Sequence, residues 1–155
     1  MQRARRHAIA LCALLAAAAP ALAGPTPGAS AFAACAVCHG ADAAGIPGAF
    51  PPLLPRVAEF AKTPAGRAYL IMVVTAGLIG DLPVDGTVYR GVMPPQAALD
   101  AAQVAAVLNH VAAGLGTTKA PARAFDAREV GEVRGRNPGA TGQSVRAMRP
   151  EVAAQ

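Results

Sequence analysis

The strongest constraint on the fold of this chain is the stretch ACAVCHG at residues 34–40. Cys35 and Cys38 stand three positions apart, and His39 follows the second cysteine directly. Four interpretations of this group are open: half of a zinc site, a thiol–disulfide redox pair, an attachment site for covalently bound haem, or chance. The rest of the sequence has to decide among them.

The first 23 residues have the pattern of a secretory signal peptide. Three arginines within residues 3–6 supply a positive start, an apolar stretch covers residues 9–19, and residues 21–23 have the A-x-A pattern of a cleavage site. Cleavage is therefore expected after about Ala23. The apolar stretch is too short to span a bilayer. We expect an exported, periplasmic protein with no transmembrane segment after cleavage.

The composition of the mature chain excludes nucleic-acid binding. Three of the 14 basic residues belong to the signal peptide and none of the 9 acidic ones does, so 11 basic residues face 9 acidic ones and the net charge is +2. The chain has no dense basic run and no tryptophan, so we expect no nucleic-acid partner. About 132 residues remain, which is enough for one small domain with an extension.

Two interpretations of the cysteine motif fit the rest of the chain poorly. A structural zinc site needs four ligands, and the mature chain offers only two cysteines and two histidines. Cys38 and His39 are neighbours, so binding one tetrahedral ion together with Cys35 would strain the backbone. A redox dithiol normally follows a strand in a βαβ unit, whereas no strand pattern precedes Cys35. A disulfide that closes so short a loop would also stabilise the fold little.

Covalent haem attachment fits the motif on chemical grounds. Two thiols separated by two residues can reach the two vinyl groups on one edge of a porphyrin. The histidine that follows can then give the iron an axial nitrogen. The sequence therefore predicts one covalently attached haem c, held by Cys35 and Cys38, with His39 as an iron ligand.

An electron-transfer haem needs a sixth ligand, for which the mature chain has four candidates. Met72 lies in the apolar run at residues 70–74, where core packing is the simpler role. Met148 lies in the polar tail, and His110 lies on an otherwise apolar helix where it suits a helix interface. Met93 stands in GVMPP, a loop in which prolines can fix the backbone and aim the side chain. We predict Met93 as the ligand, with His110 or an open site as the alternatives.

The pattern of the chain favours helices joined by long loops. We expect helices at residues 30–38 with Ser30 as N-cap, at 64–77, and at 100–113, and a helical turn within 56–62. The stretch from residue 40 to 55 is rich in glycine and proline and is expected to be loop. Asp85-Gly86 indicates a small hairpin. From residue 117 onward the composition becomes polar; we expect a short helix at 126–134, no regular structure at 135–143, and one further turn at 144–149.

Several motifs resemble those of single-domain bacterial class I c-type cytochromes, which carry one haem. These are CAVCHG at residues 35–40, FPPL at 50–53, GVMPP at 91–95 and the capped helix near 100–113, and the resemblance covers about residues 28–116. It implies an all-α cytochrome c fold for residues 24–118, with the helices packed around the haem. Residues 119–155 are then a polar C-terminal extension, partly disordered or docked on a partner.

The resemblance also implies roles for individual residues. A proline carbonyl, that of Pro52 or of its neighbour Pro51, would accept the proton on the second nitrogen of His39. His110 would stand where related helices often carry an aromatic residue that faces the N-terminal helix near Gly28 and Phe32. Candidates for the walls of the haem pocket are apolar or aromatic: Phe50, Leu53, Leu54, Tyr69, Leu70, Val73 and Val74.

These expectations favour a periplasmic carrier of single electrons rather than an enzyme. Its partners would be a donor and an acceptor protein, neither of which the sequence identifies. The alternative is a cytochrome c subunit of a larger dehydrogenase or oxidase, periplasmic or membrane-associated, docked through residues 119–155, where Phe125, Val130 and Val133 recur at helical spacing. A gas-binding haem of the four-helix-bundle type fits less well, because its cysteine motif lies near the C-terminus.

Overall fold

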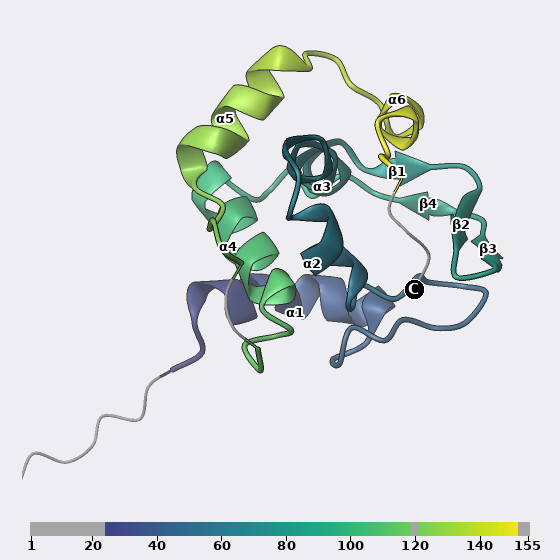
Figure 1. The fold of residues 1–155 in the computed structure, drawn as a ribbon, viewed down its shortest axis with the longest axis horizontal. Helices are drawn as coiled ribbons and strands as arrows, with labels where there is room; N and C mark the ends of the chain where they lie inside the picture. The colour runs from purple at the N-terminus through teal and green to yellow at the C-terminus, as the bar shows by residue number, and fades with distance from the viewer. Residues whose placement is uncertain (1–23, 119–120, 152–155) are drawn as a thin grey trace, which may run out of the picture.

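The computed structural model describes residues 24–118 and 121–151. The predicted signal peptide lies outside these residues, as do positions 119–120 and 152–155 of the extension. The described chain forms helices joined by loops and short antiparallel strand pairs (Figure 1). The helices are α1 (Pro27–His39), α2 (Arg56–Phe60), α3 (Pro64–Ala76), α4 (Ala101–Ala112), α5 (Ala127–Arg136) and α6 (Gly142–Ala147). The strands are β1 (Leu78–Ile79), β2 (Leu82–Val84), β3 (Thr87–Tyr89) and β4 (Val92–Met93).

Helix α1 begins three residues earlier than the sequence pattern predicts. The hydroxyl of Thr26, and not that of Ser30, caps it by accepting a hydrogen bond from the backbone N–H of Ala29. Pro27 occupies the first turn, where its missing N–H costs nothing. The helix ends at Gly40, whose φ of 79° other residues rarely adopt. This end carries the cysteine motif.

Helix α1 crosses α4 at close range, as the predicted role of His110 requires. Gly28 allows the approach, because a Cβ atom there would lie 2.5 Å from the carbonyl oxygen of Ala106. The ring of Phe32 meets that of His110 edge to face, with centroids 5.8 Å apart. Helix α4 begins with the predicted capping box of Asp100 and Gln103. This crossing fixes where the C-terminal end of α1 points.

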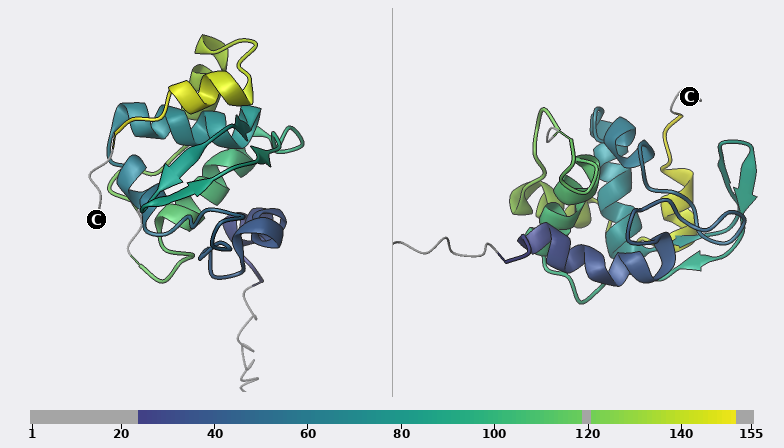
Figure 2. Two further views of the ribbon diagram at one scale, coloured as in Figure 1. Left: turned by 90° about the vertical axis from the view of Figure 1, so that its right-hand side faces the viewer. Right: turned by 90° about the horizontal axis from the view of Figure 1, so that it is seen from below.

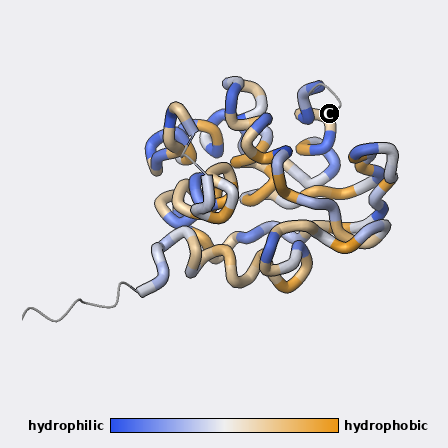
Figure 3. The backbone as a smooth tube through the Cα atoms, turned by 60° about the horizontal axis from the view of Figure 1, so that its bottom comes forward, coloured by the Kyte–Doolittle hydropathy of each residue, from blue (hydrophilic) through white to orange (hydrophobic). Residues whose placement is uncertain are grey.

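Helix α3 is the central element of the core. Thr63 caps it and Gly77 ends it, and its middle turns are buried among α2, α4, α5 and α6. Figure 3 shows the same arrangement as hydropathy, with mostly hydrophobic backbone in the middle of the molecule and hydrophilic segments at its edges. None of the helices in residues 24–118 and 121–151 is long and apolar enough to cross a membrane.

Two small antiparallel pairs connect α3 to α4. Strands β2 and β3 form the predicted hairpin, with Asp85 and Gly86 at its turn and Val84 opposite Thr87. Strands β1 and β4 pair so that Leu78 lies opposite Met93. Met93 was expected in an irregular loop; the structure places it in this short strand, where backbone pairing with β1 holds it.

The C-terminal extension differs from its prediction. Helices α5 and α6 lie on the side of α3 that faces away from α1 (Figures 1 and 2). Phe125, Val130, Val133 and Val145 are all buried in the same core as α3 and α4. The helices within residues 121–151 depart from the expected partial disorder, and the apolar side chains that suggested docking are covered by the chain itself. Docking of the extension on a partner stays a prediction. Residues 142–147 are also a capped helix, so part of the segment expected to be irregular is ordered.

Candidate functional site

A cavity of about 390 Å³ opens between the end of α1, helices α2 and α3, and the strands. Most of the side chains predicted for the site line it. They are Cys38, His39, Pro51, Pro52, Leu53, Tyr69, Leu70 and Met93. Phe50 and Val73 line the cavity as well, whereas Leu54 and Val74 pack against the core without reaching it.

The cysteine motif occupies the last turn of α1. Cys35 and Cys38 are both half-buried free thiols. Cys35 does not line the cavity; it precedes His39 by about one helical turn and so shares a face of α1 with it. Burial raises the pKa of the Cys35 thiol above its ordinary value, and the nearby Cys38 raises it further. The Cys35 thiol therefore stays protonated near neutral pH.

One hydrogen bond fixes the orientation of His39. The ring is buried, and its Nδ1–H donates to the carbonyl oxygen of Pro51 at 2.8 Å. A carbonyl oxygen can only accept, so Nδ1 carries a proton and Nε2 is the ring nitrogen left to bind a metal ion. A histidine oriented in this way suits a metal ligand. Of the two prolines named from sequence, Pro51 makes the contact.

The loop after α1 brings Pro51 to this position. Gly45 N–H donates to the carbonyl oxygen of His39 at 2.8 Å, and Leu53 N–H donates to that of Ala43 at 2.9 Å. Gly45 has a φ of 72°, and a Cβ atom there would lie 2.4 Å from the carbonyl oxygen of Phe50. A glycine is therefore required both for the turn and for the close approach of the two parts of the loop.

Of the four candidates for the sixth ligand, the structure brings only Met93 to the cavity. Its side chain is half-buried, and the residues around it are anchored by the hydrogen bond from Gln96 N–H to the carbonyl oxygen of Val74 at 2.9 Å. Met72 is buried in the core, where its sulfur lies 3.8 Å from the hydroxyl of Thr75. Neither Met148 nor His110 lines the cavity.

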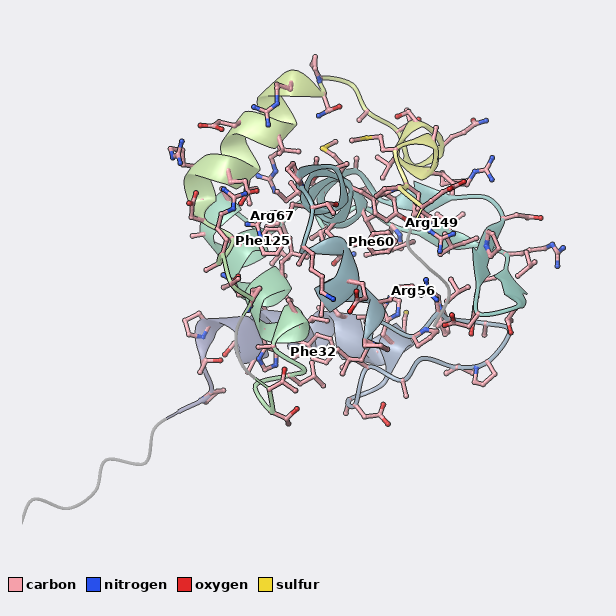
Figure 4. The ribbon with its side chains drawn as sticks, in the orientation of Figure 1. Phe32, Arg56, Phe60, Arg67, Phe125 and Arg149 are labelled. Atoms are coloured by element: carbon pink, nitrogen blue, oxygen red, sulfur yellow. The ribbon has the colours of Figure 1, made fainter. Side chains whose placement is uncertain are left out.

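Arg56 and Arg149 are among the cavity residues that the sequence analysis missed. They come from the start of α2 and from the segment after α6, and Figure 4 shows both on the side of α2 that faces the hairpin. Arg149 lies in the extension, more than a hundred positions after the cysteine motif, so no local signal connects it to the site. Arg56 stands alone in an apolar stretch, and only its place at the first turn of α2 could have drawn attention to it.

The cavity fits the group that the motif predicts. Its walls are largely apolar, which suits a large flat ring system, and they carry a histidine nitrogen, a thioether sulfur and a thiol. Arginine side chains complete the wall and suit the carboxylates that such a ring carries. The lining contains no aspartate or glutamate that would repel them.

Comparison with known proteins agrees with these features. A family model described as cytochrome c matches residues 25–114. A protein named cytochrome c-552 from Thermus thermophilus is 43% identical over 127 residues, which cover 81% of this chain and 95% of that protein. A second cytochrome c-552, from one particular strain of the same species, is also 43% identical over 127 residues, which cover 81% of this chain and 84% of that protein. The alignment with each relative is therefore longer than the segment that the family model matches.

Proposed function

Because the chain belongs to the cytochrome c family, and to its class I members with one haem, we propose that it carries single electrons between partner proteins in the periplasm. Members of this family are electron-transfer proteins with a covalently bound c-type haem, and their fold is the helical one described above. When bound, the haem supplies an iron that alternates between the ferric and ferrous states.

The observation that carries the proposal is the placement of His39 and Met93 in the walls of one cavity. We assign them as the two axial ligands. The hydrogen bond from Nδ1 to the carbonyl oxygen of Pro51 orients the ring and leaves Nε2 as the nitrogen that would bind the iron, and hydrogen bonding at Nδ1 makes the ligand nitrogen a stronger donor. The soft thioether of Met93 favours the reduced state and so raises the potential. With both positions filled, the site transfers electrons without binding a substrate.

Attachment through Cys35 and Cys38 is the second part of the proposal. Both thiols are free, and both lie on the turn of α1 that ends in His39. Thioether bonds to these two cysteines would tie the haem to the same turn of α1 that carries His39. Pro52, Leu53, Tyr69 and Leu70 would then shield the group from water.

A free carrier is favoured over a subunit of a larger dehydrogenase or oxidase. The subunit hypothesis depended on apolar residues in the extension. From the sequence alone, these residues have no evident packing partner within the chain. Phe125, Val130 and Val133 are buried in the chain's own core, so they offer no docking surface. The donor and acceptor proteins would approach the side of the molecule on which the cavity opens.

The ligand assignment is tested by Met93→Ala. In the ferric protein this variant should lose the weak absorption band near the red end of the spectrum that methionine ligation produces, and its midpoint potential should fall. The matched control is Met148→Ala, a half-buried methionine outside the cavity, which should keep both. If Met93→Ala retains the band and the potential, Met93 is not the ligand. Stopped-flow oxidation of the ferrous wild type by an acceptor protein tests electron transfer itself.

A further inference from the structure

The charged residues of the cavity wall are all of one sign. Arg56, Arg90 and Arg149 line the cavity, and within residues 24–118 and 121–151 no aspartate or glutamate does. Guanidinium groups in an otherwise apolar wall indicate that the occupant carries negative charge. Two of the three arginines already have a carboxylate partner. Arg56 pairs with Asp85 in the hairpin turn, and the exposed Arg90 pairs with Asp81 at 3.4 Å.

Arg149 is the exception. Among the described residues, no carboxylate oxygen lies within 4.0 Å of its side-chain nitrogens. One side-chain nitrogen donates to the carbonyl oxygen of Pro83 at 2.8 Å, and the side chain is half-buried. A guanidinium group has five N–H donors in a planar fork, so most of its donors remain for an anion. The contact with Pro83 fixes where that fork lies.

The extension holds Arg149 firmly at the cavity. Helix α6 is capped by Thr141 and Ser144 and anchored by the fully buried Val145. A side-chain nitrogen of Arg146 donates to the carbonyl oxygen of Asp81 at 3.2 Å, which ties the end of this helix to the strands. The chain leaves α6 directly next to the cavity, so the position of Arg149 follows from contacts that are independent of any ligand.

Arg149 also acts on a second group in the wall. Burial raises the pKa of the Tyr69 phenol above its ordinary value, and the positive charge of Arg149 offsets part of that rise. Tyr69 and Arg149 both line the cavity, so the phenol and the guanidinium lie at the same space. Arg56 and Arg149 together also line a second hollow, between the hairpin and residues 150–151, so both stand where the cavity opens outward.

A haem ring carries two carboxylates on one edge, and these are ionised at neutral pH. Burying a carboxylate beside apolar walls is costly unless a positive group pairs with it. We propose that Arg149 binds a carboxylate of the haem, beside Arg56, and that the C-terminal extension is thereby part of the cofactor site. The inference deepens the proposed function and rests on haem occupying the cavity, but it requires neither Met93 as ligand nor any particular redox partner.

The charge of Arg149 should then influence electron transfer. The positive charge of Arg149 near the iron favours the reduced state, because reduction lowers the positive charge of the iron centre by one. A variant without the charge of Arg149 loses this effect. It also leaves a haem carboxylate less well neutralised, and the negative charge of that carboxylate favours the oxidised state. Both effects lower the midpoint potential.

The experiment compares redox titrations of the wild-type holoprotein, Arg149→Gln and Arg149→Lys. Arg149→Gln should shift the equilibrium of electron exchange with a fixed reference couple toward the oxidised protein by roughly fivefold, as expected for one screened charge near the iron. Arg149→Lys keeps the positive charge, so its equilibrium should stay close to that of the wild type and show only a small part of the shift. The control is Arg128→Gln, which removes the same charge from the exposed face of α5, where the side chain is 77% exposed, and should change nothing. If Arg149→Gln behaves like Arg128→Gln, the proposal is overturned.

A crystal structure of the wild-type holoprotein gives a second readout that does not depend on the variants folding. A haem carboxylate oxygen should lie within hydrogen-bonding distance of the guanidinium of Arg149. Carboxylates turned away from Arg149 would overturn the proposal even if the potential changes. The Met93→Ala spectrum tests the proposed function separately. Whether or not Met93 binds the iron, the contact between Arg149 and a haem carboxylate should be present.

Discussion

At the scale of single residues, the contact between His39 and Pro51 depends on a glycine that touches neither cavity nor cofactor. Gly45 turns the loop at a positive φ and lets the backbone of residues 50–51 approach within van der Waals distance. The carbonyl oxygen of Pro51 is thereby placed 2.8 Å from Nδ1 of His39. The orientation of His39, the proposed iron ligand, is therefore set by backbone geometry several residues away.

Gly45→Ala should destabilise the protein more than Gly48→Ala. Both glycines have a positive φ, at 72° and 77°, so both substitutions introduce similar backbone strain. Only at residue 45 would the new Cβ atom collide with backbone, 2.4 Å from the carbonyl oxygen of Phe50, whereas residue 48 has open space. The additional overpacking should cost roughly 1–3 kcal/mol, measured as the difference in the free energy of unfolding by denaturant. Equal losses for the two variants would show that the loop adjusts freely.

Residues with a local chemical signature could be predicted from the sequence, and others could not. His39 and Met93 stand in short motifs whose residue types indicate their role, and the structure places both in the cavity wall. The choice between Pro51 and Pro52 depends on the path of the loop, which the pattern of residues does not specify. Arg149 reaches the cavity only because α5 and α6 fold back over α3, which is a tertiary feature.

At the scale of elements, an ion pair joins α3 to α5. The guanidinium of Arg67 pairs with the carboxylate of Glu129 and also donates to the carbonyl oxygens of Arg123 at 2.8 Å and Ala124 at 3.1 Å. It lies over the ring of Phe125, 3.8 Å from the centroid. The side chain of Arg67 is only 4% exposed, so its charge depends on this partner. A charge buried to this degree is costly if its partner is removed.

Glu129→Gln should lower the free energy of unfolding by roughly 1–3 kcal/mol near neutral pH, because it leaves Arg67 with a neutral partner. The hydrogen bond from Arg67 holds the pKa of Glu129 below its ordinary value. The stabilisation is thus fully present above the pKa of an unfolded glutamate and is lost as the pH falls through the lowered pKa of the folded state. The difference between wild type and variant should shrink in acid.

Denaturant unfolding at pH 7 and pH 3 measures this difference. The matched control is Glu132→Gln on the same helix, where the partner Arg128 is exposed and little stability should be lost at either pH. A gap between wild type and Glu129→Gln that stays constant from pH 7 to pH 3 would show that the ion pair is not its source.

The ends of helices could be predicted from the sequence where helix caps and helix-ending glycines stood in their usual positions. Asp100 with Gln103 predicted the start of α4, and Gly77 predicted the end of α3. The start of α1 was misplaced because both Thr26 and Ser30 are good caps, and only the structure shows which hydroxyl meets a free N–H. The extension was misjudged for a different reason. The helical spacing of Phe125, Val130 and Val133 was recognised, but the local pattern does not show that these side chains pack in the core with α3.

At the scale of the whole molecule, the extension completes the core of the cytochrome. Val130 and Val145 are fully buried, and Phe125 and Val133 nearly so. Each such side chain contributes roughly 1.5–3 kcal/mol when it is removed from water, before the entropy of ordering the chain is subtracted. A domain of this size has few buried side chains to spare.

A chain that ends at residue 118 should therefore unfold at a clearly lower denaturant concentration than the full chain, with a loss of several kcal/mol expected from these side chains. The control chain ends at residue 151 and keeps every buried side chain described for the extension, so we expect its midpoint to match that of the full chain. Thermal and denaturant unfolding of the holoproteins, with haem content checked by pyridine haemochrome, measures both. Equal midpoints for the chain ending at 118 and the full chain would show that the extension adds no stability.

The cavity wall joins residues that lie far apart along the polypeptide. The cysteine motif precedes Arg149 by more than a hundred positions, and helices α5 and α6 lie between them. A chain in which these two helices have not yet packed against α3 can therefore present its thiols and His39 while one side of the pocket is still missing. The wall is complete only once α6 has docked, so the order of folding leaves an interval in which a large cofactor can enter.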